Sequence, residues 1–580
     1  MKKSTFLFIV LLIVIGKSSL KAQETTNTEF DTYKKGFLDK YWKLYPNWAT
    51  LIGYHKYDSI LTIPDSAQRE KELKFIDKEL KSLKAFNYQN LSNLNKIDFK
   101  LIETQLQQRQ WEINELKAYE WNPSIYNVGE IFGYILSENY EPLDKRIKNI
   151  SKLLDHVNEY YDSARSTIKN PSPEHLQLAI EQNQGSLSIF EKDLTDSIGQ
   201  LKIDVKEKMN LFKKARKAAN IIYSYISFLK DLKPENPRSF RLGEELYEKK
   251  FFFEIQSHFS SDQIYDAALE RKEYLHHEME KISKELWPKY FDKQPMPENR
   301  LVLIKKVIDT ISIQHVKTED FRPYIEQQLP ELAKFVKEKN ILYLDPSKPL
   351  KVRQEPGYMA GVAGASMSAP GPYEKNGTAY YNVGTLDGWN TEKAESYLRE
   401  YNKYTLQILN IHEAIPGHYA QLVYSNQSPS LIKSVFQNST MIEGWAVYSE
   451  LMMLENGYGN DDPEMWLFYY KWNLRSTCNT ILDISVHTRN MSEEQAMDLL
   501  INQAFQQKTE AEGKWHRVQV TNVQLCCYFT GFKEILDLRE EYKQLKGPAY
   551  NLKSFNEKFL SYGSAPVKYI HDLLLLRDEQ

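Results

Sequence analysis

Two histidines and a glutamate stand within seven positions in the stretch HEAIPGH, from His412 to His418. In the common zinc-protease signature the histidines lie four residues apart on one helical face, with a glutamate beside the first. Here they are six apart, so a straight helix would set the side chains about 120° apart and about 9 Å offset along its axis. They could not then share a zinc ion, whose bonds to nitrogen are about 2.0 to 2.1 Å long.

Pro416 and Gly417, between the two histidines, change this expectation. Proline has no N–H to donate to the carbonyl of His412 and its ring clashes there, so the helix must kink or open. Glycine permits backbone angles that other residues resist. We expect the break to swing His418 back beside His412. The alternative interpretation is a proline-broken helix that merely contains two histidines.

The next acidic landmark is Glu443, twenty-five residues after His418. A turn region at 428–430 allows two antiparallel helices to bring Glu443 against the histidines. Two histidines and one carboxylate leave a coordination position for water, which is typical of catalytic zinc. Glu413 would then be the general base that takes a proton from that water. Glu450, on the same helical face as Glu443, is either a hydrogen-bond partner of a ligand histidine or a solvated surface residue.

The charge balance excludes some classes of partner. The chain has 580 residues with 75 Lys and Arg against 78 Asp and Glu, interleaved along its length, for a net charge of -3. This gives no electrostatic reason to expect nucleic acid or an acidic membrane surface. A peptide or a small amide is the default substrate, and the sequence leaves the oligomeric state open.

The first 22 residues have the pattern of a signal peptide. Lys2 and Lys3 precede an apolar run at 6–15, and a plausible cleavage point follows Ala22. The run is short for a membrane span and no later run is long enough, so we expect an exported chain, periplasmic or secreted, without stable membrane insertion. No cysteine lies near the cleavage point, so lipid attachment there is not expected. The three cysteines, at 478, 526 and 527, are expected to be buried thiols.

The rest of the chain has mainly helical periodicity, which predicts a mainly α fold. A capping box at Ser260 to Gln263 predicts the start of a long helix that should end before Pro288. The prolines at 288, 295 and 297 mark the best linker. We therefore predict an N-terminal helical region at 23–290 and a second helical region at 291–580 that carries the chemistry.

A glycine- and proline-rich segment at 356–388 contains the one convincing strand, at 378–383. An extended substrate could pair with this strand, which makes Tyr380 and Asn382 candidate substrate-binding residues. The alternative is a hairpin that packs a corner of the domain. A helix is expected to start near Thr391 and to run into HEAIPGH.

Several motifs together resemble the bacterial family called domain of unknown function 885. They are HEAIPGH at 412–418, EGWAVYSE at 443–450, DISVH at 483–487, and Arg517 with the stretch 524–528 and Gly531. That family is grouped with the gluzincin metallopeptidases and is similar in layout to the angiotensin-converting-enzyme and thermostable-carboxypeptidase branches. The resemblance covers most of the mature chain. It implies a large, multi-helical, cleft-bearing fold with a small sheet near the active site, and one zinc ion held by His412, His418 and Glu443.

The C-terminal motifs supply further candidates. Peptidases of this type need donors to the tetrahedral oxyanion, for which we nominate Tyr528 and His487. Arg517 would clamp a substrate carboxylate, with Gln524 beside it in the substrate-binding set. The structural alternatives are a helix-capping tyrosine, an Asp483–His487 pair and a surface ion pair. The family usually has Pro-Gly where this chain has Asn522-Val523, and Arg-Tyr where it has Arg517-Val518. The resemblance therefore does not predict the conformation of this loop.

Together these observations predict an exported zinc-dependent hydrolase, in particular a metallopeptidase acting on short peptides. Arg517 favours an exopeptidase over a broad endopeptidase. A different class of function is a non-catalytic helical protein that binds peptides and retains a metal site. A third hypothesis, hydrolysis of a non-peptide amide or ester, uses the same residues.

Overall fold

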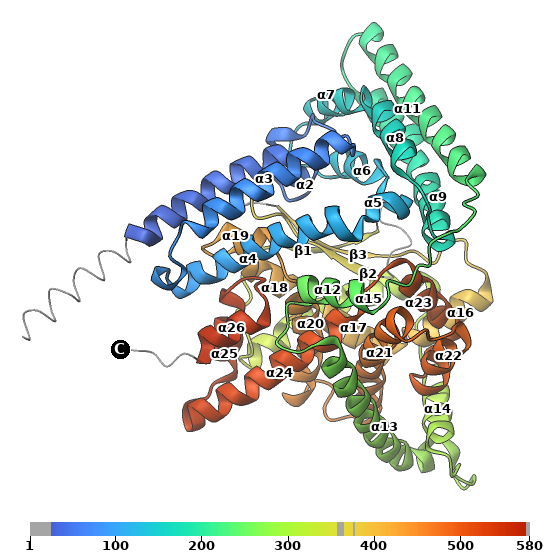
Figure 1. Ribbon diagram of the computed structural model, residues 1–580. Helices are drawn as coiled ribbons and strands as arrows, with labels where there is room; N and C mark the ends of the chain where they lie inside the picture. Colours follow the sequence, from blue (N-terminus) through green and yellow to red (C-terminus); the bar gives the residue numbers. More distant parts are fainter. Residues whose placement is uncertain (1–24, 356–364, 375–376, 576–580) are drawn as a thin grey trace, which may run out of the picture.

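A computed structural model describes residues 25–355, 365–374 and 377–575, and these residues form many helices around one small sheet (Figure 1). The prediction of a mainly α fold is confirmed. The predicted signal peptide and residues 356–364 of the turn-rich segment lie outside the described residues. Within the described part of the chain, no helix combines the length and the apolar character that crossing a membrane requires.

The described residues before the sheet form a series of helices joined by loops. After a helix at residues 25–44 come α2 Pro46–Leu51, α3 Ser66–Lys84, α4 Asn93–Trp111, α5 Ala118–Trp121, α6 Gly129–Ser137, α7 Leu143–Leu154, α8 Val157–Thr167, α9 Pro173–Ser188, α10 Leu194–Gln200, α11 Val205–Asp231, α12 Glu244–Ile255, α13 Ser261–Phe291, α14 Arg300–Ile311 and α15 Phe321–Glu338.

A second series of helices follows the sheet. They are α16 Thr391–Glu400, α17 Lys403–Glu413, α18 His418–Asn426, α19 Leu431–Val435, α20 Ser439–Glu455, α21 Pro463–Thr488, α22 Glu493–Met497, α23 Lys508–Val520, α24 Cys527–Lys546, α25 Leu552–Ser561 and α26 Val567–Leu575.

The sheet has three strands in the order β1-β3-β2, namely β1 Leu350–Gln354, β3 Ala379–Val383 and β2 Ala365–Ser368. The central strand β3 runs parallel to β1 and antiparallel to β2. The predicted strand is therefore present. Both of its edges are already paired, so the prediction that an extended substrate pairs with it is wrong. The buried Tyr381 hydroxyl of β3 donates to Asn410 Oδ1 at 2.9 Å, which fixes α17 against the sheet.

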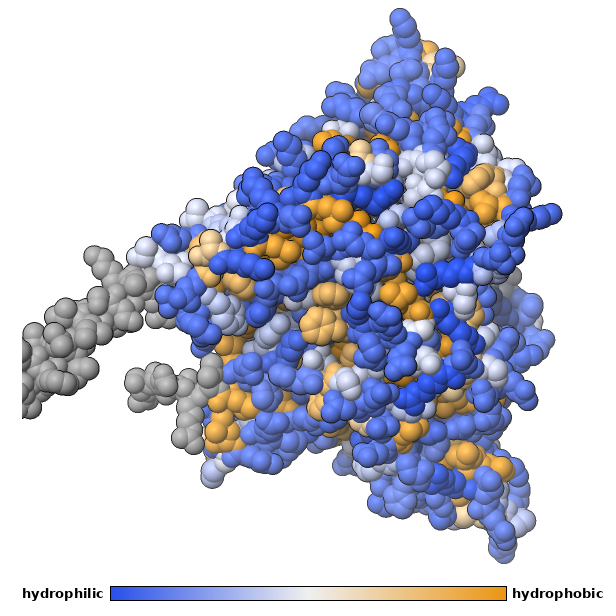
Figure 2. Space-filling model, viewed as in Figure 1, coloured by the Kyte–Doolittle hydropathy of each residue, from blue (hydrophilic) through white to orange (hydrophobic). Residues whose placement is uncertain are grey.

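Two separate apolar cores fill the molecule. One lies mainly among α6 to α11, with buried residues Leu61 and Tyr126 to Leu229, and α7, α8 and α11 lie at the top of Figure 1. The other includes the first helices and nearly everything from Leu242 onward. The face seen in Figure 2 is mostly hydrophilic, with hydrophobic residues in small separate patches. The predicted boundary near residue 290 does not separate the two cores, because residues on both sides of it belong to the second one.

Helix α13 runs across that predicted boundary. Its capping box at Ser260 is present, as predicted, but the helix continues through Pro288 to Phe291. The Trp287 ring stacks on Phe291 with a centroid distance of 4.0 Å, and its Nε1 donates to the carbonyl of Gln294 at 2.9 Å. This packing holds the last turn together although proline removes one backbone donor.

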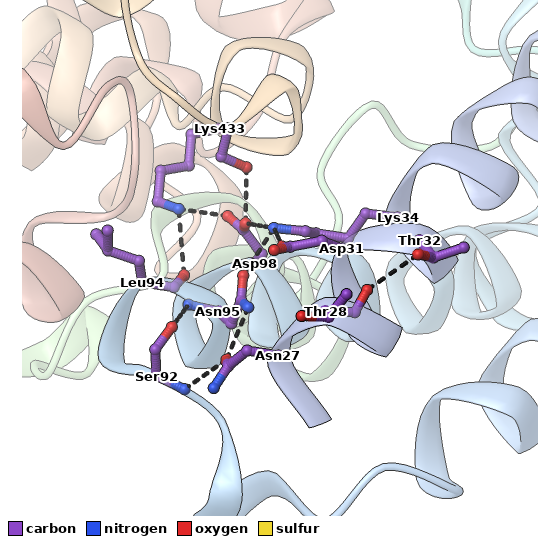
Figure 3. A network of polar contacts seen from close by, with 11 residues as sticks. Asn27, Thr28, Asp31, Thr32, Lys34, Ser92, Leu94, Asn95, Asp98 and Lys433 are labelled. Atoms are coloured by element: carbon purple, nitrogen blue, oxygen red, sulfur yellow. Dashed lines mark hydrogen bonds and ion pairs between the residues drawn. The ribbon is translucent and has the colours of Figure 1, made fainter. Parts of the chain in front are cut away.

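A buried ion cluster joins the first helices to the second half of the chain (Figure 3). Asp98 of α4 accepts a hydrogen bond from Lys34 at 2.7 Å and one from Ser430 at 2.6 Å, and it forms an ion pair with Lys433 of α19. Lys34 also donates to Asn95 at 2.7 Å. Burial lowers the pKa of Lys433. Because α19 lies between α18 and α20, this cluster ties the N-terminal helices to the segment that carries the predicted ligands.

Replacement of this buried carboxylate tests its importance. Asp98→Asn leaves the charge of Lys433 without a buried partner, so we expect the free energy of unfolding to fall by about 3 to 5 kcal/mol in chemical denaturation. The matched control is Glu70→Gln, because Glu70 pairs with Lys74 at 3.5 Å on the surface and should change stability by less than about 1 kcal/mol. Equal effects of the two substitutions would contradict a structural role for the cluster.

Candidate metal centre

The chain breaks between the two histidines of HEAIPGH. Helix α17 ends at Glu413, α18 begins at His418, and the Ile415–Pro416 peptide bond is cis. The N–H of Gly417 donates to the carbonyl of Ile411 at 3.0 Å. A Cβ atom on Gly417 would lie 1.9 Å from the carbonyl oxygen of His412, so only glycine fits this turn. The predicted break is therefore present.

The approach to this motif differs from the prediction of one continuous helix from Thr391. Helix α16 ends at Glu400 and α17 starts at Lys403. The buried Asn402 lies between them, and its side chain accepts hydrogen bonds from the N–H groups of Tyr404 and Thr405. Asparagine at this position caps α17 and gives the helix that bears His412 its own starting point.

The structure brings the three predicted ligands together. The Nε2 atom of His412 lies 3.6 Å from Oε2 of Glu443, and the Nε2 atom of His418 lies 3.4 Å from the same oxygen. The two imidazole rings have centroids 4.8 Å apart and planes at 86°. Two ligand atoms on a tetrahedral zinc ion with bonds of about 2.0 to 2.1 Å are separated by about 3.3 to 3.4 Å. The observed separations fit such a site.

Two carboxylates compete for the role of third ligand. His412, Glu413 and His418 offer ligand atoms that all lie within 4.8 Å of one another. Glu443 lies closer to both histidines, and its distances match the edge of a coordination tetrahedron. The distances therefore favour Glu443 over Glu413 as the third ligand of a bound metal ion.

Glu450 is fully buried and contacts the first histidine. Its Oε1 lies 2.7 Å from Nδ1 of His412 and accepts a hydrogen bond from Trp472 Nε1 at 3.0 Å. This contact favours the tautomer with its proton on Nδ1, which leaves the lone pair of Nε2 directed at the centre. Of the two interpretations of Glu450, the structure supports the hydrogen-bond partner and not the surface residue.

The ionisable side chains at the centre interact strongly with one another. Burial would lower the pKa of His412, but its contacts with Glu443 and Glu450 raise it to about 10. Burial would raise the pKa of Glu443, but the two histidines hold it well below its usual range. Burial raises the pKa of Glu413. The two imidazoles and the Glu443 carboxylate are nitrogen and oxygen donors that a metal dication accepts, so the residues fit a bound metal ion.

A close helix crossing positions Glu443. Helices α20 and α24 meet at Gly444 and Gly531, where a Cβ on Gly444 would lie 2.3 Å from the carbonyl carbon of Gly531. This approach sets Glu443 beside Tyr528, near the start of α24. The ring of Tyr528 lies 6.4 Å from that of His412, with an angle of 23° between the planes.

Three predicted residues of the C-terminal motifs meet at this place. Arg517 of α23 donates through Nη2 to Gln524 Oε1 at 2.6 Å and to the hydroxyl oxygen of Tyr528 at 3.2 Å. All three side chains are partly exposed. Because the tyrosine oxygen accepts from Arg517, its own proton remains available to another acceptor.

His487 lies elsewhere, and its position does not support the predicted role as an oxyanion donor. Its Nε2 is 2.9 Å from the carbonyl oxygens of Val518 and Thr521, and its buried ring stacks on that of Tyr247. The predicted Asp483–His487 pair is replaced by other contacts, because the last turn of α21 faces the end of α23 and the following loop. His487 therefore supports the backbone that leads to Gln524.

The loop that departs from the family pattern is held by Asp483. Its Oδ1 accepts from the Tyr247 hydroxyl at 2.7 Å and from the N–H of Val523 at 2.9 Å, and its Oδ2 accepts from the N–H of Leu525 at 3.3 Å. Val523 has a φ of 70°, which is strained for a β-branched residue. Glycine, the usual family residue here, adopts this angle without strain.

Sequence reasoning missed two further supporting residues. Trp445 donates through Nε1 to the carbonyl of Pro416 at 2.9 Å and so holds the break between the histidines. Trp472 donates to Glu450. For Trp445 a signal existed, since a side chain with one polar atom lies two positions after the ligand Glu443. Trp472 stands in an apolar helix with no motif around it.

Tyr380 and Asn382 do not lie where a substrate could use them as predicted. Asn382 is fully buried, accepts from Arg353 Nε at 2.6 Å and donates to Ser368 Oγ at 2.7 Å. The guanidinium group of Arg353 covers the ring of Tyr380, 4.0 Å from its centroid. Both side chains contact residues of the neighbouring strands, because Arg353 belongs to β1 and Ser368 belongs to β2.

The crossing of α20 and α24 can be tested by adding one methyl group. Gly444→Ala forces the two helices apart, so we expect the free energy of unfolding to fall by about 1 to 3 kcal/mol in chemical denaturation. Gly185→Ala is the control, since nothing lies within 4 Å of the added Cβ in α9 and stability should rise by about 0.5 to 1 kcal/mol. An unchanged free energy of unfolding for Gly444→Ala would show that α20 and α24 can move apart without loss of stability.

Comparisons with known proteins place the fold among bacterial proteins. A solved structure described as a "putative lipoprotein of unknown function" from Shewanella oneidensis is 50% identical, with a TM-score of 0.84, and the match covers 94% of this chain and 99% of that one. A "putative lipoprotein" from Colwellia psychrerythraea shares the fold at 16% identity, with a TM-score of 0.76 and coverage of 95% and 98%. No curated protein matches the chain.

One family model also matches, over residues 46–574, and its description is "Bacterial protein of unknown function (DUF885)". That match spans most of the 580 residues and includes the three predicted ligands, the glycine crossing and the Arg517–Tyr528 contact described above. The chain therefore belongs to the bacterial family DUF885.

Proposed function

We propose that this chain is an exported zinc-dependent hydrolase that cleaves short peptides. The observation that carries the proposal is the pair of imidazole nitrogens at 3.6 and 3.4 Å from one oxygen of Glu443. Two nitrogens and one oxygen are donors that zinc accepts, and three protein ligands leave room for water and substrate. The free carboxylate of Glu413 beside this set supplies the base that hydrolysis requires.

Each side chain has a separate role in the proposed hydrolysis. A bound zinc ion would polarise the scissile carbonyl and lower the pKa of water. The Glu413 carboxylate accepts a proton from the attacking water and delivers it to the leaving amine nitrogen. The hydroxyl of Tyr528, held by Arg517, donates a hydrogen bond to the oxyanion that develops on the carbonyl oxygen. Glu450 keeps His412 in its ligand orientation.

Peptides are the proposed substrates because the motifs resemble those of gluzincin peptidases. For export, the proposal depends on the signal-like residues 1–22. The Shewanella and Colwellia proteins are described as lipoproteins, but this chain has cysteines only at Cys478, Cys526 and Cys527, all free and buried as predicted.

Metal content tests the centre directly. We expect elemental analysis of the purified mature protein after zinc reconstitution to give about one zinc per chain, and His418→Ala and Glu443→Ala to lose it, because each removes one of three ligands. His571→Ala is the control. His571 belongs, with His258 and Asp572, to the other described group that could hold an ion, so this variant should keep the zinc. Absence of zinc from the unaltered protein would refute the proposed function.

Turnover separates a hydrolase from a protein that only binds peptides. Glu413→Gln should retain zinc and reduce peptide cleavage by about 100-fold to 10,000-fold, because it removes the base without removing a ligand. A peptide library analysed by mass spectrometry gives the cleavage rates of both forms. Stoichiometric binding of intact peptides by both forms, with no cleavage by either, would instead favour a binding protein.

A further inference from the structure

A buried group of cations borders the metal centre between α21 and α23. Lys471 and Arg475 come from α21, and Lys514 and Arg517 come from α23. Two carboxylates accompany these four cations, and the first is Glu400 of α16. Its Oε1 lies 2.7 Å from the Lys471 ammonium, and its Oε2 accepts from a backbone N–H at 3.0 Å. Glu400 is therefore fully engaged by Lys471 and the backbone.

The second carboxylate, Glu510 of α23, must serve two cations. It forms an ion pair with Arg475, and one of its oxygens lies 3.9 Å from Nζ of Lys514. That separation is beyond hydrogen-bond distance. Within the part of the chain that the structure describes, the side-chain hydrogen bonds of Arg517 go to the neutral groups of Gln524 and Tyr528. Lys514 and Arg517 therefore lack a carboxylate of their own.

The donors of this cation group are not all used. Lys514 is 4% exposed, and among the described residues its Nζ has Glu510 as its one ion-pair partner. Burial lowers the pKa of Lys514 well below its usual range. The Nε of Arg475 is buried without a hydrogen-bond partner. An unmet buried donor costs about 1 to 3 kcal/mol, so Arg475 Nε would gain from an acceptor that a ligand supplies.

The cation group reaches the centre from two sides. Arg475 lies over the ring of Trp472, 4.5 Å from its centroid, and Trp472 bonds to Glu450. On the other side Arg517 bonds to Tyr528, next to the imidazole of His412. The side chains of Arg475 and Glu510 are 18% and 19% exposed, so the group extends to the surface.

Building on the proposed function, we propose that Arg475, Lys514 and Arg517 form a carboxylate-binding subsite that selects peptides with a carboxylate near the scissile bond. Guanidinium groups bind carboxylates through paired hydrogen bonds, and a lysine adds a point charge. Glu413, Glu443 and Glu450 are the other charges near this subsite. A metal dication at the centre offsets most of their negative charge and leaves the subsite positive. The carboxylate is either the free C-terminus of the peptide or an acidic side chain.

Binding to an inactive, zinc-loaded protein tests the subsite separately from catalysis. Isothermal titration calorimetry on Glu413→Gln uses acetyl-trialanine as the free acid, the same peptide as its C-terminal amide, and an acetylated alanyl-alanyl-aspartate amide. We expect the free acid to bind about 10-fold to 100-fold more tightly than the amide, because charge-assisted hydrogen bonds are lost in the amide. If the aspartate amide binds like the free acid, side-chain carboxylates are also recognised. If it binds like the amide, the subsite selects the C-terminus.

Substitutions of lysines on α23 identify the side chain responsible. Lys514→Met should remove most of the difference between acid and amide, and Lys514→Arg should keep most of it. Lys508→Met is the matched control, since Lys508 is 78% exposed on the same helix and should leave the difference unchanged. Circular dichroism checks that each variant is folded. The comparison of peptides in the parent protein does not depend on any lysine variant.

The outcomes separate this proposal from the proposed function. Equal binding of all three peptides, or no binding of any, overturns the subsite. Equal cleavage of acid and amide by the unaltered protein also overturns it, and the hydrolase then stands. Binding that requires the carboxylate, without cleavage by the unaltered protein, supports the subsite and contradicts the hydrolase.

Discussion

The candidate metal centre depends on one constraint, the return of the backbone between His412 and His418. Six residues on a regular helix would separate these side chains, and the observed turn instead places both Nε2 atoms near one oxygen of Glu443. The turn is held by the N–H of Gly417, which bonds to the carbonyl of Ile411, and by Trp445, which bonds to Pro416. The same helix, α20, thus supplies both the third ligand and the support for the turn.

The surrounding elements fix the remaining parts of the centre from different directions. Strand β3 fixes α17 through Tyr381 and Asn410, and α24 brings Tyr528 in through its glycine crossing with α20. The buried Asp98 cluster ties the N-terminal helices to α19. Each contact joins segments far apart in sequence. The geometry of the centre is therefore a property of the whole second core and not of HEAIPGH alone.

Short sequence patterns correctly predicted the features that depend on neighbouring residues. The break at Pro416-Gly417, the capping box at Ser260 and the approach of Glu443 to the histidines follow from residue types and spacing. The errors concern long-range packing. Nothing in the sequence of β3 shows that β1 and β2 occupy both of its edges, or that Arg353 and Ser368 of those strands contact Tyr380 and Asn382. The orientation of His487 depends on the backbone after α23, and the passage of α13 through Pro288 depends on the packing of Trp287.

The turn at Val523 depends on a side chain from another helix. Glycine adopts a φ of 70° without strain, and here Val523 adopts it. The Asp483 carboxylate, forty residues upstream in helix α21, accepts hydrogen bonds from the backbone N–H groups on either side of Gln524. Two hydrogen bonds from distant backbone to one buried carboxylate thus hold a conformation that is strained for valine itself. Loss of the Asp483 carboxylate would leave both N–H groups without this acceptor.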